Sequence, residues 1–431
     1  LLDERKDVNT VAARRIDRDH LDLQVLADRS ENQLEGWDAG REKREIHGRM
    51  LRVDHRSSIA KTPLVHGKDS ARVERAVEEE LRAGCESGIF PGASACVAIW
   101  DGGASHYVTQ TAGVRADGGS SVAPDSIFDL ASLTKPFVAT AALRLHQSGA
   151  FPLEARIDAI IPEARGLPLG ERNWEQVLSH RSGLEAWAPF YDEVPEEPGS
   201  DAARDWIVAD LVRRLDESMV GTSVYSDLGY ILAGVAMSRA TDAPLEELVG
   251  RHVTVPLGID ETLFFGARRA DDGWKSRCAS TGSSPWRRRE LVGEVNDDNC
   301  AALGGVAGHA GMFGLAKSVA TFGAACVGAW HGRRGAMDEE LIRHATAERP
   351  LGTHRLGWDG KADLGSAAGA AIDAQSFGHL GFTGTSIWCD PRRQLVIALL
   401  TNRVAILGDN AAIRAFRPAF HDAVVRAFDG Y

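Results

Sequence analysis

A serine and a lysine three positions apart are the strongest pointer to chemistry in this sequence. They occur in Ser132-Leu133-Thr134-Lys135, where a segment with helical periodicity begins. At this spacing the two side chains share one helical face. A serine hydroxyl becomes a good nucleophile when a nearby base accepts its proton, and a desolvated lysine amine can do so. The backbone N–H groups at the start of a helix would also stabilise developing negative charge.

The same spacing occurs a second time, in Ser58-Ile59-Ala60-Lys61. The dipeptide Thr62-Pro63 follows it, and proline disfavours a helical conformation in the residue before it. The motif at Ser132 is instead followed by an amphipathic helical pattern and preceded by an apolar run. We therefore predict that Ser132, and not Ser58, is the nucleophile.

Two further short motifs carry groups that could assist Ser132. Tyr225-Ser226-Asp227 lies just before an apolar segment and offers a phenol that could relay a proton. His379-Leu380-Gly381 lies just before a predicted hairpin, and its glycine would let a substrate approach the backbone closely.

Both motifs have competing interpretations. Asp227 could simply cap the helix that follows it, since aspartate is a good N-cap residue. His309-Ala310-Gly311 has the same pattern as the motif at His379. We favour His379 because a strand-turn-strand pattern follows it.

The elements that must position these residues include strands at both ends of the chain. Alternating or apolar runs predict strands at 93–100, 106–112, 386–389 and 395–401, and helical patterns cover 132–147 and roughly 410–428. Residues 150–330 are mainly helical patterns separated by loops. The pattern predicts an α+β fold in which distant segments build an antiparallel sheet flanked by helices, with an inserted, mainly helical region.

Composition narrows the function classes. The 431 residues carry a formal net charge of -12, which argues against nucleic-acid binding. No apolar run reaches the roughly 20 residues of a membrane span. The sequence contains no nucleotide-binding glycine motif, no nucleophile-elbow motif and no metal-ligand spacing, so we expect no cofactor and no metal. The expected partner is a small molecule or a short peptide, and the oligomeric state stays open.

The N-terminal part differs from the rest of the chain. Residues 1–65 are dense in balanced charge and weak in apolar periodicity, which predicts a poorly ordered extension ahead of a domain at 66–431. No secretory signal precedes the domain, so the expected location is the cytoplasm as the sequence stands. A periplasmic or extracellular location fits if the N-terminus is incomplete or misassigned.

In combination, the motifs resemble a known family. Ser-x-x-Lys, Tyr-x-Asp and His-x-Gly occur in the order found in class C β-lactamases and D-alanyl-D-alanine carboxypeptidases of the penicillin-binding-protein superfamily. The flanking segments 90–92, 178–184, 225–230, 304–311 and 378–384 are similar to that family's landmarks as well. The resemblance covers roughly residues 70–428 and implies the β-lactamase/transpeptidase-like fold.

The resemblance also implies roles for the residues of the site. Ser132 would form an acyl-enzyme, with Lys135 and Tyr225 sharing the general-base work. The backbone N–H groups of Ser132 and of Phe382, which follows Gly381, would form the oxyanion hole. His379 would bind a substrate carboxylate or orient Tyr225.

Three residues depart from the family pattern. Asp227 stands where asparagine is common, and its charge would favour the protonated form of Lys135. His379 replaces a frequent lysine, and Leu380 replaces a hydroxyl residue. The expected function is a serine hydrolase acting on D-alanyl peptides, small esters or amides, or β-lactams. The alternatives are an esterase on the same scaffold and a catalytically impaired protein that binds peptides as a sensor.

Overall fold

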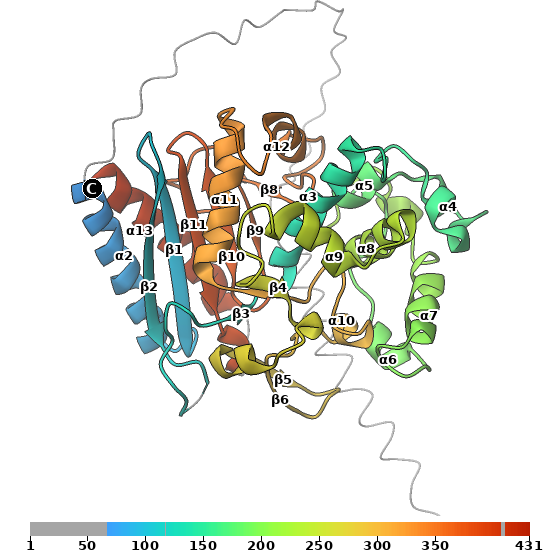
Figure 1. Cartoon of the computed structure of the whole chain (residues 1–431), viewed down its shortest axis with the longest axis horizontal. Coiled ribbons are helices and arrows are strands. Elements are labelled where there is room, and N and C mark those ends of the chain that lie inside the picture. The colour runs from blue at the N-terminus through green and yellow to red at the C-terminus, as the bar shows by residue number, and fades with distance from the viewer. Residues whose placement is uncertain (1–66, 117, 407–409) are drawn as a thin grey trace, which may run out of the picture. The chain divides into compact units, whose positions relative to one another are not determined.

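Six strands from the two ends of the chain form one antiparallel sheet (Figure 1). The computed structural model describes residues 67–116, 118–406 and 410–431. The sheet has the order β2-β1-β11-β10-β9-β8. Its strands are β1 (Gly92–Trp100), β2 (Ser105–Gly113), β8 (Asp359–Gly360), β9 (Phe377–Leu380), β10 (Ser386–Asp390) and β11 (Leu395–Thr401). The first hairpin therefore pairs directly with the last one, since Ala93 lies opposite Thr401.

Helices cover both faces of this sheet. Helices α2 (Gly67–Glu86) and α13 (Ala411–Asp429) pack on one face, and α11 (Ala316–Trp330) packs on the other (Figure 1). Alternate residues of a strand point to opposite faces. In β1, Val97 joins the core beneath α2 and α13, whereas Cys96 and Ala98 join the larger core on the α11 side. This double burial explains why β11 consists almost entirely of apolar residues.

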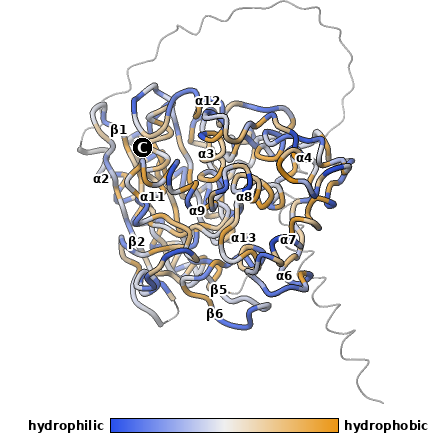
Figure 2. Tube along the Cα trace, turned by 45° about the vertical axis from the view of Figure 1, so that its right-hand side comes forward, coloured by the Kyte–Doolittle hydropathy of each residue, from blue (hydrophilic) through white to orange (hydrophobic). Residues whose placement is uncertain are grey.

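The inserted region between β2 and β8 carries most of the remaining elements. Its helices include α3 (Thr134–Gln147), α4 (Ile157–Ile160), α5 (Trp174–Leu178), α6 (Phe190–Glu193), α7 (Asp201–Leu211), α8 (Asp227–Thr241), α9 (Leu245–Val249), α10 (Asp298–Ala302) and α12 (Glu339–Thr346). A small sheet joins β3 (Phe128–Asp129), β7 (Met312–Gly314) and β4 (Leu263–Phe265). A hairpin joins β5 (Ser280–Ser284), which is largely buried, to β6 (Arg289–Val292), which is largely exposed, and its turn is hydrophilic (Figure 2).

Helix α8 is buried on nearly all sides. Ten of its residues from Asp227 to Met237 are buried, as expected of a helix in the interior of a large domain. Helix α3 is similar, with eleven buried residues, so the two helices that begin near the candidate catalytic residues are rigidly packed.

The α+β fold and the antiparallel sheet predicted from the sequence are confirmed. The sequence pattern also suggests Ser70 as the N-cap of the first helix, but α2 begins at Gly67 and Ser70 lies inside it. The extension predicted for residues 1–65 lies outside the described residues. In the part that the structure describes, every helix is too short or too polar to cross a lipid bilayer.

Candidate active site

Ser132 lies in a tight turn that leads directly into α3. Ala131, Ser132 and Leu133 form a single 3₁₀ turn, and Ala131 has a positive φ of 47°. The Asp129 carboxylate fixes this conformation, since its Oδ1 accepts a hydrogen bond of 2.8 Å from the Ala131 N–H. Non-glycine residues rarely adopt this backbone conformation, and those that do are concentrated at functional sites. The turn leaves Ser132 only partly buried at the start of the helix.

The Lys135 ammonium is the centre of the site. Its Nζ donates to Ser132 Oγ at 2.9 Å, to the Tyr225 hydroxyl at 2.6 Å and to Asp227 Oδ1 at 2.7 Å. An ammonium group has three protons, so each of these bonds uses one of them. Lys135 has no exposed surface, and the Asp227 side chain is 2% exposed. Four of the residues singled out in the sequence therefore meet in one cluster, in which Lys135 and Asp227 are buried and Ser132 and Tyr225 are partly exposed.

Charges in the cluster determine its resting protonation. Burial by itself would lower the pKa of Lys135, but the charge and hydrogen bonds of Asp227 and Tyr225 outweigh it and raise that pKa above its ordinary value. Burial is also the main cause that raises the pKa of Tyr225, against the opposing effects of Lys135 and Ser132. At neutral pH the cluster thus holds a lysine ammonium, an aspartate and a neutral phenol.

His180 holds the Tyr225-Ser226-Asp227 segment in place. Its Nδ1 accepts a hydrogen bond of 3.0 Å from the Ser226 N–H, and its ring lies 4.7 Å from the Tyr225 ring. Burial lowers the pKa of His180 well below its usual value, so the ring is neutral and can accept this bond. The cap of α8 is Ser226, whose Oγ accepts from the Gly229 N–H. The cap interpretation of Asp227 is therefore wrong, and its carboxylate pairs with Lys135.

His379 lies on β9, opposite Ile387 of β10, and its ring centroid is 6.0 Å from that of Tyr225. Its Nδ1 lies 2.7 Å from the Leu380 carbonyl oxygen. Burial and the nearby Lys135 charge lower the pKa of His379 to about 3. The ring is consequently neutral at physiological pH. The competing His309 lies in a loop and pairs with Asp297 at 3.0 Å.

The turn after β9 is fixed to the segment that precedes Ser132. Thr385 Oγ1 donates to the Leu130 carbonyl at 3.1 Å, and Thr383 Oγ1 donates to the Asp129 carbonyl at 2.8 Å. A Cβ on Gly381 would lie 2.6 Å from the Leu130 oxygen and 2.0 Å from Thr385 Oγ1, so only glycine fits this approach.

The two expected oxyanion donors are therefore carried by one hydrogen-bonded frame. The backbone N–H groups of Ser132 and Phe382 donate to no acceptor among the described residues. Phe382 is 38% exposed, which places its side chain at the surface of the site. The arrangement leaves both N–H groups available to a substrate oxygen.

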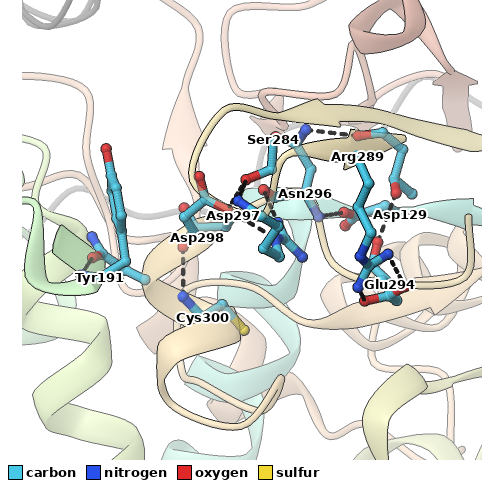
Figure 3. Close-up of polar contacts among 12 residues, drawn as sticks. Asp129, Tyr191, Ser284, Arg289, Glu294, Asn296, Asp297, Asp298 and Cys300 are labelled. Atoms are coloured by element: carbon cyan, nitrogen blue, oxygen red, sulfur yellow. Dashed lines mark hydrogen bonds and ion pairs between the residues drawn. The ribbon is translucent and has the colours of Figure 1, made fainter. Parts of the chain in front are cut away.

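A second hydrogen-bond network binds the other carboxylate oxygen of Asp129 (Figure 3). Asp129 Oδ2 accepts a hydrogen bond of 2.6 Å from the Asn296 N–H, and burial raises the pKa of Asp129 to about 6. Next to Asn296, Asp297 caps α10 by accepting from the Cys300 N–H at 2.7 Å. The adjacent Asp297 and Asp298 suggest a metal site or, more simply, a solvated loop in the sequence, but in the structure Asp298 binds Arg287 and Ser284.

Sequence reasoning missed several of these supporting residues. The position of Arg403 just after the final strand suggests a surface residue, but Arg403 is 8% exposed and donates through Nε to the Phe382 carbonyl at 2.9 Å. The six cysteines are free thiols, and five of them are buried. In the described part of the chain, no group of three or more histidine, cysteine or acidic side chains is arranged to hold a metal ion.

Comparisons with known proteins agree with this geometry. Residues 73–417 match the family model described as Beta-lactamase. The chain is 27% identical over 379 residues to an N-acetylmuramyl-L-alanine amidase of Bacillus subtilis (strain 168), covering 80% of this chain and 83% of the relative. It is 26% identical over 303 residues to a putative D-alanyl-D-alanine carboxypeptidase of Escherichia coli (strain K12), covering 64% and 69%.

A solved structure supports the fold independently. The fold superimposes on a class C beta-lactamase with a TM-score of 0.65 and 17% identity, covering 85% of this chain and 99% of the other. The Ser-x-x-Lys cluster has the composition of a serine-hydrolase site, and the superposition shows the fold in which it lies. The family match covers most of the chain, and the chain therefore belongs to the β-lactamase family.

Proposed function

We propose that this protein is an amidase that cleaves an amide bond of a peptidoglycan fragment through an acyl-enzyme on Ser132. The amide that we propose joins the lactyl group of a muramyl sugar to the first amino acid of a peptide. The observation that carries the proposal is the burial of His379, which is 5% exposed and has its Nδ1 2.7 Å from the Leu380 carbonyl oxygen. Because burial lowers its pKa to about 3, His379 offers no positive charge to the terminal carboxylate of a D-alanyl peptide or a penicillin.

Two further observations support an internal amide as the substrate. Leu380 supplies no hydroxyl beside His379, which removes a second group that could bind a carboxylate. Among the reported relatives, the amidase matches over the larger share of both chains. A muramyl amide has no free carboxylate next to its scissile carbonyl. Its binding therefore does not require a positive charge at the position of His379.

In the proposed reaction, Ser132 Oγ attacks the amide carbonyl and its proton passes into the Lys135–Tyr225 pair. The resulting oxyanion accepts hydrogen bonds from the N–H groups of Ser132 and Phe382. Tyr225 then returns a proton to the departing amine while the C–N bond breaks. Water hydrolyses the ester on Ser132 in the second half, which releases the acid and restores the hydroxyl.

The charged state of Lys135 sets a requirement for this mechanism. An ammonium cannot accept the proton of Ser132, so the cluster must first lose a proton. We expect activity to rise with pH for this reason. The same ion pair between Lys135 and Asp227 favours a second candidate, a protein that binds its ligand and turns it over very slowly.

The test compares muramyl dipeptide, a diacyl-Lys-D-Ala-D-Ala peptide, benzylpenicillin and p-nitrophenyl butyrate on the wild type and on Ser132→Ala. We expect the wild type to release the free dipeptide from muramyl dipeptide, detected by mass spectrometry, and the variant to release none. Release of D-alanine from the peptide with intact muramyl dipeptide would reject the proposal in favour of a carboxypeptidase. Ester hydrolysis alone would identify an esterase, and binding without turnover would identify a sensor.

A further inference from the structure

A buried arginine from the last helix binds the peptide group that carries one of the two expected oxyanion donors. Arg417 belongs to α13 and is 6% exposed. Its Nη2 donates to the Gly381 carbonyl at 2.5 Å and to the Thr385 carbonyl at 2.9 Å. The Gly381 carbonyl and the Phe382 N–H belong to the same peptide bond.

The geometry of a peptide bond links these two groups. In a trans peptide the C=O and N–H bonds lie in one plane and point in opposite directions. Fixing the Gly381 oxygen on Arg417 therefore turns the Phe382 N–H away from α13. A charged hydrogen bond to the carbonyl also polarises the amide, which makes its N–H a stronger donor.

Neighbouring bonds hold the rest of the turn. Arg403 donates to the Phe382 carbonyl through Nε at 2.9 Å and through Nη2 at 2.5 Å. The Gly381 N–H donates to the Thr385 carbonyl at 2.8 Å. The peptide groups on both sides of the Phe382 Cα are thus bound to an arginine.

Stability does not explain a charge at this position. Helix α13 already buries apolar residues such as Phe420 and Val424. Its C-terminal end is held by an ion pair of 2.7 Å between Arg393 Nη2 and Asp429 Oδ2. Arg417 Nε is buried and has no hydrogen-bond partner among the described residues, which is a cost to the folded state. Burial, Arg403 and Arg414 lower the pKa of Arg417 to about 9, so its charge persists at neutral pH.

We propose that Arg417 is a positioning residue for the oxyanion hole, which orients and polarises the Gly381–Phe382 peptide so that the Phe382 N–H stabilises the transition state. The inference rests on the nucleophile and oxyanion donors of the proposed function, but not on the proposed substrate. It predicts a loss in the chemical step and little change in ground-state binding.

The experiment measures two quantities for Arg417→Met, Arg417→Lys and the control Arg393→Met. One is the rate at which a fluorophosphonate labels Ser132, and the other is kcat and KM for p-nitrophenyl butyrate. Loss of a whole oxyanion donor lowers kcat by about 100- to 1,000-fold, so we expect a weakened donor to lower it by about 10- to 100-fold. In Arg417→Met the labelling rate should fall equally, with KM within about 3-fold of wild type.

The control separates this role from the docking of α13. Arg393→Met removes the contacts with Asp429 and with the buried Asp390 but leaves the turn at Gly381 untouched, so its labelling rate should stay within about 2-fold of wild type even though its melting temperature should fall. A folded Arg417→Met protein with wild-type labelling overturns the inference, and so does an equal loss in Arg393→Met.

Two further outcomes keep the test decisive. If Arg417→Met does not fold, Arg417→Lys decides: a loss of about 3-fold or more in labelling at unchanged KM supports the inference, and wild-type labelling overturns it. Failure of the fluorophosphonate to label the wild type also overturns it. A wild type that is labelled but does not cleave muramyl dipeptide overturns only the proposed substrate.

Discussion

Asp227→Asn tests the central electrostatic argument about the site. Asp227 and Lys135 form a buried ion pair of 2.7 Å, and the charge of Asp227 is one cause of the raised pKa of Lys135. Asparagine has nearly the same shape and keeps an oxygen for the hydrogen bond, but it removes the charge. The pKa of Lys135 should fall, because burial lowers this pKa and the charge of Asp227 no longer raises it. The rise of kcat/KM with pH should therefore occur at lower pH than in the wild type.

The same substitution has a calculable effect on stability. Removing one partner of a buried ion pair costs about 3–5 kcal/mol. The retained hydrogen bond to a charged group is worth about 1.5–3 kcal/mol, which leaves a net loss of roughly 1–3 kcal/mol while Lys135 stays charged. In the wild type, the raised pKa of Lys135 adds stability that is present below its unfolded value and is lost as pH rises through the folded value. The difference in the free energy of unfolding between the variant and the wild type should therefore become smaller as the pH rises.

The assay combines pH profiles of kcat/KM for p-nitrophenyl butyrate with urea unfolding at several pH values. Asp390→Asn is the matched control, since Asp390 is also fully buried and pairs with Arg393 at 2.9 Å, outside the cluster at Lys135. The control should lose stability but keep the wild-type pH profile. An unmoved profile in Asp227→Asn would refute the argument that Asp227 holds Lys135 in its charged form.

Three other predictions concern single groups of the site. Ser132→Ala should abolish hydrolysis and Ser58→Ala should leave it unchanged, as measured by turnover of p-nitrophenyl butyrate; loss in the Ser58 variant alone would overturn the choice of nucleophile. Tyr225→Phe should lower kcat by about 100- to 10,000-fold at similar KM, because the phenol returns the proton to the leaving group; unchanged kcat would remove it from the relay. His379→Lys should increase adduct formation with benzylpenicillin, seen by intact mass, and no gain would argue against the charge explanation of substrate choice.

Much of the fold could be predicted from the sequence because its signals are local. The apolar runs of β1 and β11 and the helical pattern after Ser132 are visible in short windows, and their elements lie within a residue or two of the predicted bounds. The pairing of the first hairpin with the last followed from strands at both ends. The cluster of Ser132, Lys135, Tyr225 and Asp227 was predicted as a set through the resemblance, and the structure brings these residues into contact.

The supporting residues could not be predicted in the same way. His180 reaches Ser226 across 46 positions and Asp129 reaches Asn296 across 167, and neither contact has a sequence pattern of its own. Aspartate and serine are both good N-caps, so Asp227 could not be separated from Ser226 without the coordinates. Arg403 follows a strand, where exposed arginines are common, and only the packing against Phe382 explains its burial.

Two of the three departures from the family pattern, at Asp227 and His379, act on the site in the same direction. The negative charge of Asp227 balances the positive charge of Lys135 within the cluster, and His379 is uncharged where many relatives have a lysine. Each change taken alone would only weaken the attraction of the site for an anionic group. Together they leave Ser132, Lys135 and Tyr225 in hydrogen-bond contact, while neither position offers a positive charge to a terminal carboxylate. Both departures therefore favour the proposed substrate, in which the scissile carbonyl lies inside a neutral amide.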